Sequence, residues 1–201
     1  RLLISFHDLK AAQRFLNYVC DLEPYTLKVC DLRIINAAVE RGKKSALFIR
    51  KIGKGLLVVV SFNYRHFKMA KKLRQCLEAL PEGTFYVEET PANSESFYSL
   101  NNALLSYLND ANRGERTPIL DDVFVPSMHF GDFLSGLKTL ERKLQLDLPV
   151  FGSFITSNYN VRPDIARTTV EGRKKLIDFM KSYAELVESC HGSLTGNGPE
   201  G

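Results

Sequence analysis

The chain has 201 residues, of which 44% are hydrophobic and 25% charged, and its 27 basic and 23 acidic residues give a formal net charge of +4. This balance is typical of a globular protein and excludes a disordered, collagen-like or disulfide-built chain. The longest apolar run, Leu56 to Val60, is far shorter than the roughly 20 residues of a membrane-spanning helix, so we expect no membrane span. Because the sequence lacks an initiator methionine and a signal-peptide pattern, we interpret it as one domain excised from a longer cytoplasmic protein, leaving open a peripheral attachment to a membrane.

Predicted strands and helices alternate through the first 89 residues. Leu2 to Phe6 is a short apolar run, and Asp8 then opens an amphipathic helix whose apolar residues recur at three- and four-residue spacing as far as Val19. Further strands are predicted over 25–30, 46–49, 56–62 and 84–89, and further helices from Asp31 to near Gly42 and over 67–80. A strand-helix-strand unit used twice predicts the split βαβ arrangement of a ferredoxin-like sheet.

The alternation of strands and helices begins again after a predicted connecting helix. A polar segment after Pro91 carries apolar residues at helical spacing between Phe97 and Leu108, and the loop Arg113 to Pro118 follows it. Beyond that loop we predict strands over 122–125, 149–156 and 193–195 and helices over 131–146 and 170–189. The predicted fold is therefore α+β: a mostly antiparallel, ferredoxin-like sheet with helices packed on one face, in two related halves, residues 1–112 and 113–201.

Cysteine and histidine usage excludes several kinds of site. No CxxC pair is present, which argues against a zinc ribbon or iron–sulfur cluster and favours reduced structural thiols at the four cysteines, Cys20, Cys30, Cys76 and Cys190. Cys190 and His191 are adjacent, but neighbours in sequence usually point apart, so a catalytic dyad there is disfavoured.

The basic residues are unevenly distributed. Eleven of the 27 lie between Arg41 and Arg74, a stretch without Asp or Glu. Such a block could follow a phosphate backbone, so a nucleic-acid-binding ferredoxin-like module is one interpretation. We favour the alternative, a solvated face that docks on an acidic neighbouring domain, because the sequence contains no RNA-binding aromatic signature.

The C-terminal part carries three motifs in a fixed order. They are Leu120 to Pro126 (LDDVFVP), Leu148 to Gly152 (LPVFG) continued by Asn158 to Pro163 (NYNVRP), and His191 to Gly196 (HGSLTG) after a long helix. From Ile119 to Gly201 this order resembles the C-terminal, substrate-binding domain of FAD-linked oxidases, the D-lactate dehydrogenase and glycolate oxidase group. The corresponding family motifs read E-D-V-A-V-P, V-F-G-H-x-G-D-G-N-L-H and G-G-S-I-S-G-E-H-G-I-G.

The resemblance also shows what this chain has lost. Many family members bind a divalent metal through two histidines of the second motif and the glutamate of the third, and the next histidine acts as base. The chain has Ser153 and Asn160 at the histidine positions, Asn197 at the glutamate position and Gly198 at the base position. Neutral oxygens bind zinc or manganese too weakly to replace these ligands, so we expect no metal.

The resemblance implies the substrate-side domain of an FAD-dependent oxidoreductase that acts on a small-molecule acid. FAD would be held mainly by an N-terminal flavin-binding module outside this chain, which would be its partner, and the fragment alone would be inactive. Arg162 is the cation that could pair with a substrate carboxylate, and His191 is the remaining candidate base. The full set of expected substrate- or flavin-facing residues is Ser153, Asn158, Asn160, Arg162 and Asn197.

A different class of function stays open beside the enzyme. A domain that kept this fold and lost its chemistry would serve as a non-catalytic interaction or regulatory domain, and the missing ligands and base are what favour it.

Overall fold

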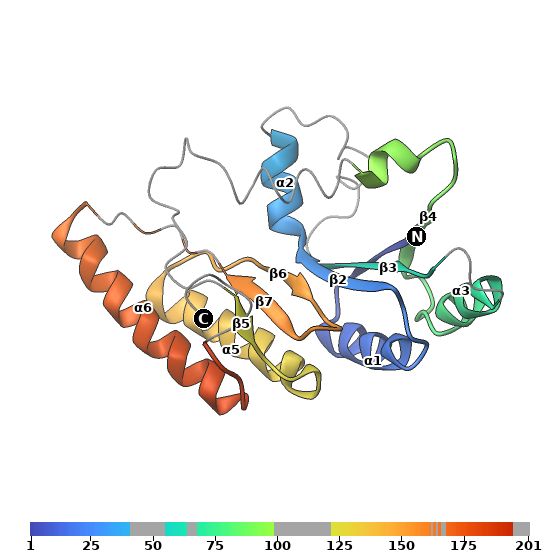
Figure 1. Ribbon diagram of the computed structural model, residues 1–201. Helices are drawn as coiled ribbons and strands as arrows, with labels where there is room; N and C mark the ends of the chain where they lie inside the picture. Colours follow the sequence, from blue (N-terminus) through green and yellow to red (C-terminus); the bar gives the residue numbers. More distant parts are fainter. Residues whose placement is uncertain are drawn as a thin grey trace. The chain divides into compact units, whose positions relative to one another are not determined.

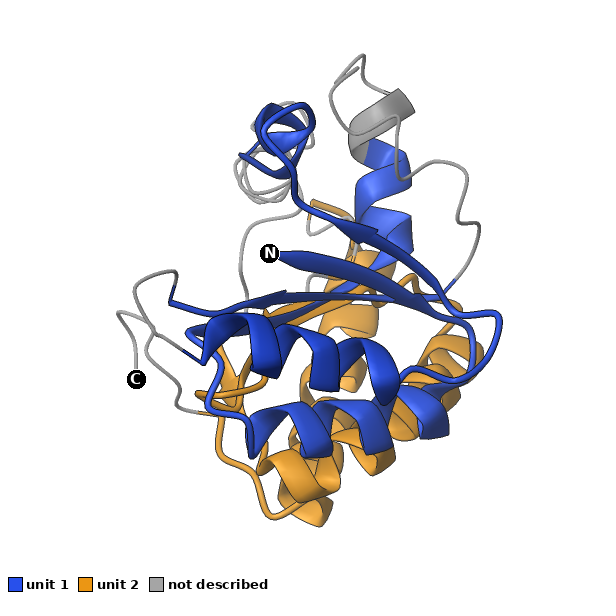
Figure 2. Ribbon diagram, turned by 90° about the vertical axis from the view of Figure 1, so that its right-hand side faces the viewer, with its two compact units in different colours: residues 1–110 blue, residues 111–201 orange. Residues whose placement is uncertain are grey.

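The structure, a computed structural model, describes residues 1–40, 55–63, 68–98, 122–161, 163, 165 and 168–194. The chain divides into two compact units, Arg1–Asp110 and Ala111–Gly201, shown in blue and orange in Figure 2. No helix in the described ranges is both long enough and apolar enough to cross a membrane. That the whole chain is one domain of a longer protein stays a prediction.

Unit 1 is a four-stranded antiparallel sheet with the strand order β4-β1-β3-β2. Its elements are β1 (Leu2–Phe6), α1 (Leu9–Cys20), β2 (Thr26–Asp31), α2 (Leu32–Glu40), β3 (Leu56–Ser61), α3 (Met69–Glu78) and β4 (Phe85–Glu88). Figures 1 and 2 show α1 and α3 covering the same face of the sheet, with α2 on the opposite side. The predicted pair of strand-helix-strand units and the ferredoxin-like order are confirmed.

Local signals in the sequence explain α1. The Asp8 carboxylate accepts hydrogen bonds from the backbone N–H groups of Lys10 and Ala11, at 2.9 and 3.3 Å, and so caps the first turn. The buried stripe of the helix packs on the sheet, where the rings of Phe6 and Phe15 lie 5.2 Å apart. Burial of this apolar stripe is the main force that holds the helix on the sheet.

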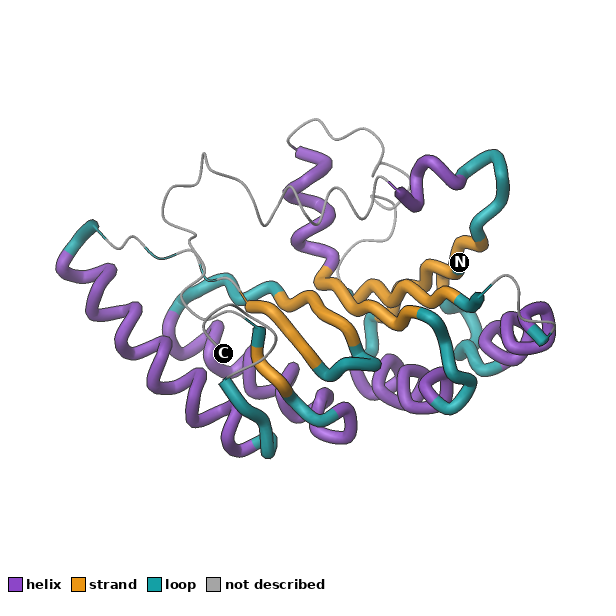
Figure 3. Tube along the Cα trace, in the orientation of Figure 1, coloured by secondary structure: helices purple, strands orange, loops and turns teal. Residues whose placement is uncertain are grey.

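Unit 2 is a three-stranded antiparallel sheet with two long helices. Its elements are β5 (Val123–Phe124), the 3-10 turn η3 (Ser127–His129), α5 (Phe130–Leu144), β6 (Val150–Ser153), β7 (Asn158–Val161) and α6 (Val170–Ser189). β7 pairs with both β6 and β5. α5 and α6 run side by side along one face of these strands (Figures 1 and 3). An aromatic core joins these elements: the Phe130 ring of α5 stacks on Tyr159 of β7 at 4.7 Å, and the Phe133 ring of α5 lies 6.2 Å from that of Tyr183 on α6.

The predicted strand over 149–156 is wrong in its second half. β6 ends at Ser153, residues 154–157 form a turn, and a second strand, β7, occupies residues 158–161, where no strand was predicted. Phe154 extends the apolar run without extending the strand, because its buried ring packs edge-on against Phe130 at 5.6 Å. Ser157, with φ of +56°, then reverses the chain.

Several smaller predictions can be compared with the structure. Asp31 is the last residue of β2 rather than the start of a helix. Ser193, in the predicted final strand over 193–195, forms an isolated antiparallel bridge with Phe124, and residue 195 lies outside the described residues. Residues 94–98 are helical, but the strand predicted over 46–49 and the loop Arg113 to Pro118 lie outside the described residues.

Candidate functional site

The β6–β7 hairpin brings three of the predicted site residues onto one face of the unit 2 sheet. Ser153 lies directly opposite Asn158, and Asn160 lies opposite Phe151. Successive side chains of a strand point to opposite faces, and Tyr159 and Val161 point into the helix-covered core. Ser153, Asn158 and Asn160 therefore project from the face that α5 and α6 leave uncovered.

The neighbouring strand adds a carboxylate to this face. Phe124 of β5 lies opposite Asn158, and Asp122, two residues earlier, lies beside Asn160. The side-chain amide of Asn160 donates a hydrogen bond to Oδ1 of Asp122. We call these four half-buried residues the polar face: Asp122, Ser153, Asn158 and Asn160.

Tyr183 of α6 lies beneath the sheet, near Asp122. Its hydroxyl is fully buried and has no hydrogen-bond partner among the described residues. Burial, and then the negative charge of Asp122, raises the pKa of Tyr183 well above its usual value. Tyr183 is therefore neutral at physiological pH.

The candidate base His191 contacts the side chain of His129. It follows the C-terminus of α6 with φ of +55°, a left-handed conformation that usually favours glycine. Its exposed imidazole lies against that of His129, with 4.9 Å between ring centroids. The structure thus assigns His191 a contact at the helix ends, and its role as a base stays a prediction.

Two other predicted site residues, Arg162 and Asn197, lie outside the described residues. Arg162 directly follows β7, whose last residue is Val161. Its pairing with a substrate carboxylate stays a prediction, as does the position of Asn197.

The cysteines are structural rather than reactive. All four are free thiols, and three of them are buried. Burial raises the pKa of Cys76 to about 12, and burial also raises the pKa of the other three thiols above the usual value. A nucleophilic cysteine needs a lowered pKa, so the structure offers no support for a Cys190–His191 dyad.

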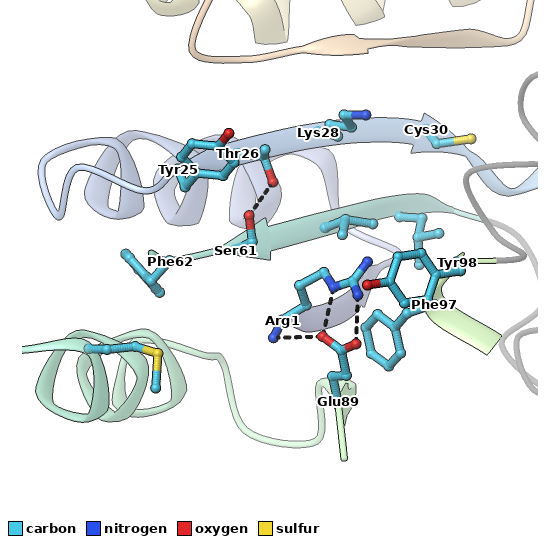
Figure 4. A pocket seen from close by; sticks show the side chains of 13 residues that line it. Arg1, Tyr25, Thr26, Lys28, Cys30, Ser61, Phe62, Glu89, Phe97 and Tyr98 are labelled. Atoms are coloured by element: carbon cyan, nitrogen blue, oxygen red, sulfur yellow. Dashed lines mark hydrogen bonds and ion pairs between the residues drawn. The ribbon is translucent and has the colours of Figure 1, made fainter. Parts of the chain in front are cut away.

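Unit 1 contains a pocket of about 700 Å³ that the sequence did not predict. Its floor is the sheet face that α1 and α3 leave uncovered, with Thr26 and Lys28 from β2 and Val59 and Ser61 from β3 (Figure 4). The hydroxyls of Thr26 and Ser61 share a hydrogen bond of 2.6 Å. This volume is in the usual range for a small-molecule pocket.

A partly buried ion pair forms one wall of this pocket. The guanidinium of Arg1 donates to both carboxylate oxygens of Glu89, at 2.6 and 2.7 Å (Figure 4). The ring of Tyr98 lies over the same guanidinium, 4.5 Å from its carbon. The paired charges and the stacked ring hold this wall in one geometry.

Comparisons with known proteins agree with this architecture. A sequence profile for the C-terminal domain of FAD-linked oxidases matches residues 1–197. The chain belongs to this family. No curated protein sequence gave a match.

Two solved structures have a similar fold. One is an alkyldihydroxyacetonephosphate synthase, with a TM-score of 0.58 and 13% identity over 98% of this chain and 40% of that chain. The other is a 4-ethylphenol oxidase from Gulosibacter chungangensis in complex with isoeugenol, with a TM-score of 0.59 and 12% identity over 94% of this chain and 43% of that chain. The FAD-linked oxidase C-terminal domain described here therefore spans about two fifths of each of these structures.

The polar face does not suit the metal that many family members bind. Ser153 and Asn160, which the sequence resemblance places at the two histidine positions, offer a hydroxyl and an amide, and the amide nitrogen is already bonded to Asp122. One carboxylate with neutral oxygens is a poor donor set for zinc or manganese, which favour imidazole, thiolate or several carboxylates. Among the described residues, no group of three His, Cys, Asp or Glu side chains is placed to hold a metal ion.

Sequence reasoning missed Asp122 as a site residue. The motif LDDVFVP contains it, but only the pairing of β5 with β7 places it beside Asn160. The sequence did contain a signal for it. Asp122 is two residues before Phe124 in a short predicted strand, and alternate residues of a strand lie on the same face.

Proposed function

We propose that this chain is the substrate-side domain of an FAD-dependent oxidoreductase that resembles D-2-hydroxyacid dehydrogenases and has lost the family metal site. The observation that carries the proposal is the polar face, because family membership is combined there with neutral side chains at both histidine positions. In the proposed enzyme, Ser153, Asn158 and Asn160 bind and orient the substrate by hydrogen bonds.

FAD would supply the hydride-transfer chemistry when bound. In this proposal it is held mainly by a flavin-binding module outside these 201 residues, and this domain covers the reactive side of the site. The sheet face opposite α5 and α6 supports that arrangement, since it presents a half-buried, polar surface that no described helix or strand of unit 2 covers. The fragment alone would then be inactive, and the complete protein would be cytoplasmic.

Arg162 has a specific place in this proposal. It follows β7 directly, so it is one residue beyond the strand that carries Asn158 and Asn160. A guanidinium can bind a carboxylate through two parallel hydrogen bonds. We therefore assign it to the carboxylate of a small 2-hydroxy acid, while the polar face takes the hydroxyl end.

The test uses the full-length protein, purified with its flavin and mixed anaerobically with D-lactate or glycolate. We expect bleaching of the oxidised flavin band by at least one of these acids and a slower reaction with L-lactate. Asn158→Ala should weaken the apparent affinity for the acid about tenfold, the cost of one lost hydrogen bond. Asn17→Ala, which removes the same amide from the exposed face of α1, is the matched control.

Two results would contradict the proposal. A full-length protein that binds no flavin would favour the interaction or regulatory domain, which has the same fold and needs no cofactor. A flavoprotein that neither acid reduces would keep the family assignment and overturn the 2-hydroxyacid substrate class.

A further inference from the structure

We infer that Asp122 and Asn160 form a hydroxyl-recognition pair, in which Asp122 positions the Asn160 amide and a substrate hydroxyl donates its one hydrogen bond to an oxygen atom of the pair. The inference rests on the proposed function and adds to it a residue and a contact that the family motifs do not assign. It explains how a site without a metal can still hold the hydroxyl end of its substrate.

The first step is the orientation of the amide. Asn160 Nδ2 donates to Asp122 Oδ1. A carboxylate can only accept, so the atom of the Asn160 amide that faces it must be the nitrogen and not the oxygen. The two ends of an amide diverge from Cγ, and Oδ1 of Asn160 is therefore turned away from Asp122.

The second step is the acceptor capacity that remains. An ionised carboxylate has about four acceptor positions, and Asn160 fills one of those on Asp122. No described residue donates to Asn160 Oδ1. The pair therefore presents carboxylate and amide oxygens on a face that is only half-buried.

The third step is the chemistry that these acceptors select. They bind a group that donates, such as an alcohol hydroxyl, and the negative charge of Asp122 repels a carboxylate at the same place. Tyr183, the neutral neighbour beneath the sheet, does not offset that charge. A 2-hydroxy acid would thus bind with its hydroxyl at this pair and its carboxylate elsewhere.

The experiment compares glycolate with acetate, which lacks the hydroxyl, on the full-length flavoprotein. Binding is read from the ligand-induced rise in the melting temperature of protein whose flavin has been reduced beforehand with dithionite, so that glycolate binds without reacting. Wild-type protein should prefer glycolate, and Asp122→Asn should weaken glycolate binding about 10- to 100-fold while leaving acetate binding unchanged. Asp178→Asn, the same change on the exposed face of α6, is the matched control and should alter neither.

A pair of charge-swapped variants tests the positioning role separately. Asn160→Asp alone places two carboxylates side by side and should lower the melting temperature and abolish the glycolate preference. Adding Asp122→Asn to it restores one amide and one carboxylate with their places exchanged, and should recover the melting temperature and part of the preference.

The outcomes distinguish this inference from the proposed function. A glycolate preference that survives Asp122→Asn, or a double variant no better than Asn160→Asp, would overturn the pair while the flavoenzyme proposal stands. A wild-type protein that shows no preference between glycolate and acetate and no flavin reduction would overturn both.

Discussion

Gly152 and Tyr159 face each other across the β6–β7 hairpin, and the missing side chain of Gly152 makes room for the buried Tyr159 ring. A Cβ atom at position 152 would lie 2.8 Å from Cδ1 of Tyr159 and would overlap the carbonyl oxygen of Asn158. The glycine thus allows the close pairing of strands that sets Ser153 against Asn158 on the other face.

Gly152→Ala should therefore destabilise unit 2. Neither the backbone oxygen nor the packed ring can move freely, so we expect a loss of about 2 to 3 kcal/mol in the free energy of unfolding, measured with urea. Ser153→Ala, at the next position of β6, removes atoms instead of adding them and should cost about 1 kcal/mol or less. Equal stability of the two variants would show that the hairpin does not need a glycine.

The ion pair of unit 1 should make stability depend on pH. Burial raises the pKa of Glu89, but hydrogen bonds from Arg1 and Ser94 outweigh it and lower that pKa below its usual value. A lowered carboxyl pKa contributes stability above the unfolded-state pKa of roughly 4.3, and this contribution disappears as the pH falls through the folded-state pKa. Glu89→Gln should thus cost about 1 to 3 kcal/mol at pH 7 and less below pH 4.

Glu88→Gln is the control for that measurement. Glu88 is the exposed neighbour on β4, so its variant should match the wild type in urea melts at both pH values. A constant difference between Glu89→Gln and wild type from pH 7 to pH 3 would show that the ion pair does not respond to protonation as proposed.

Tyr183 should tolerate loss of its hydroxyl. The group is buried and has no hydrogen-bond partner among the described residues, so folding removes it from water without compensation. We expect Tyr183→Phe to leave the free energy of unfolding unchanged or to increase it by about 1 kcal/mol, whereas Tyr183→Ala should cost about 3 to 5 kcal/mol. A large loss in the phenylalanine variant would reveal a partner for the hydroxyl in the complete protein.

The full-length protein should contain no stoichiometric divalent metal at the polar face. In the proposed alignment the Ser153 hydroxyl and the Asn160 amide replace the two imidazoles, and these neutral oxygens bind zinc or manganese too weakly. Elemental analysis of the purified protein measures its metal content. Flavin reduction by D-lactate or glycolate should also proceed equally with and without a chelator. Zinc or manganese that is lost in Asn160→Ala would contradict this prediction.

The basic block from Arg41 to Arg74 should not be a nucleic-acid site. Only part of it is described, and there Lys72 of α3 already pairs with Glu23 at 3.3 Å. We expect no submicromolar RNA or DNA binding at physiological salt, measured by fluorescence anisotropy. Tight, salt-sensitive binding that disappears when Lys68, Lys71 and Lys72 are replaced together would favour the nucleic-acid module instead.

Local patterns in the sequence were sufficient for much of the fold. Asp8 caps α1 and the apolar spacing up to Val19 sets its buried face, and both signals act within a few turns of the chain. The same holds for α5 and α6, whose predicted bounds differ from the observed ones by at most two residues. Helix periodicity and capping are short-range properties, and a single sequence contains them in full.

The site depended on contacts that are distant in sequence. The sequence predicted one strand over 149–156, and only the packing of Phe154 on Phe130 shows why the chain turns there. Asp122 and Asn160 are 38 residues apart, and they meet because β5 pairs with β7 in one register. The sequence by itself thus determined the helices and the ferredoxin-like order of unit 1. Only the tertiary structure decided which side chains share the polar face, because strand register is selected by the packing of the whole sheet on its helices.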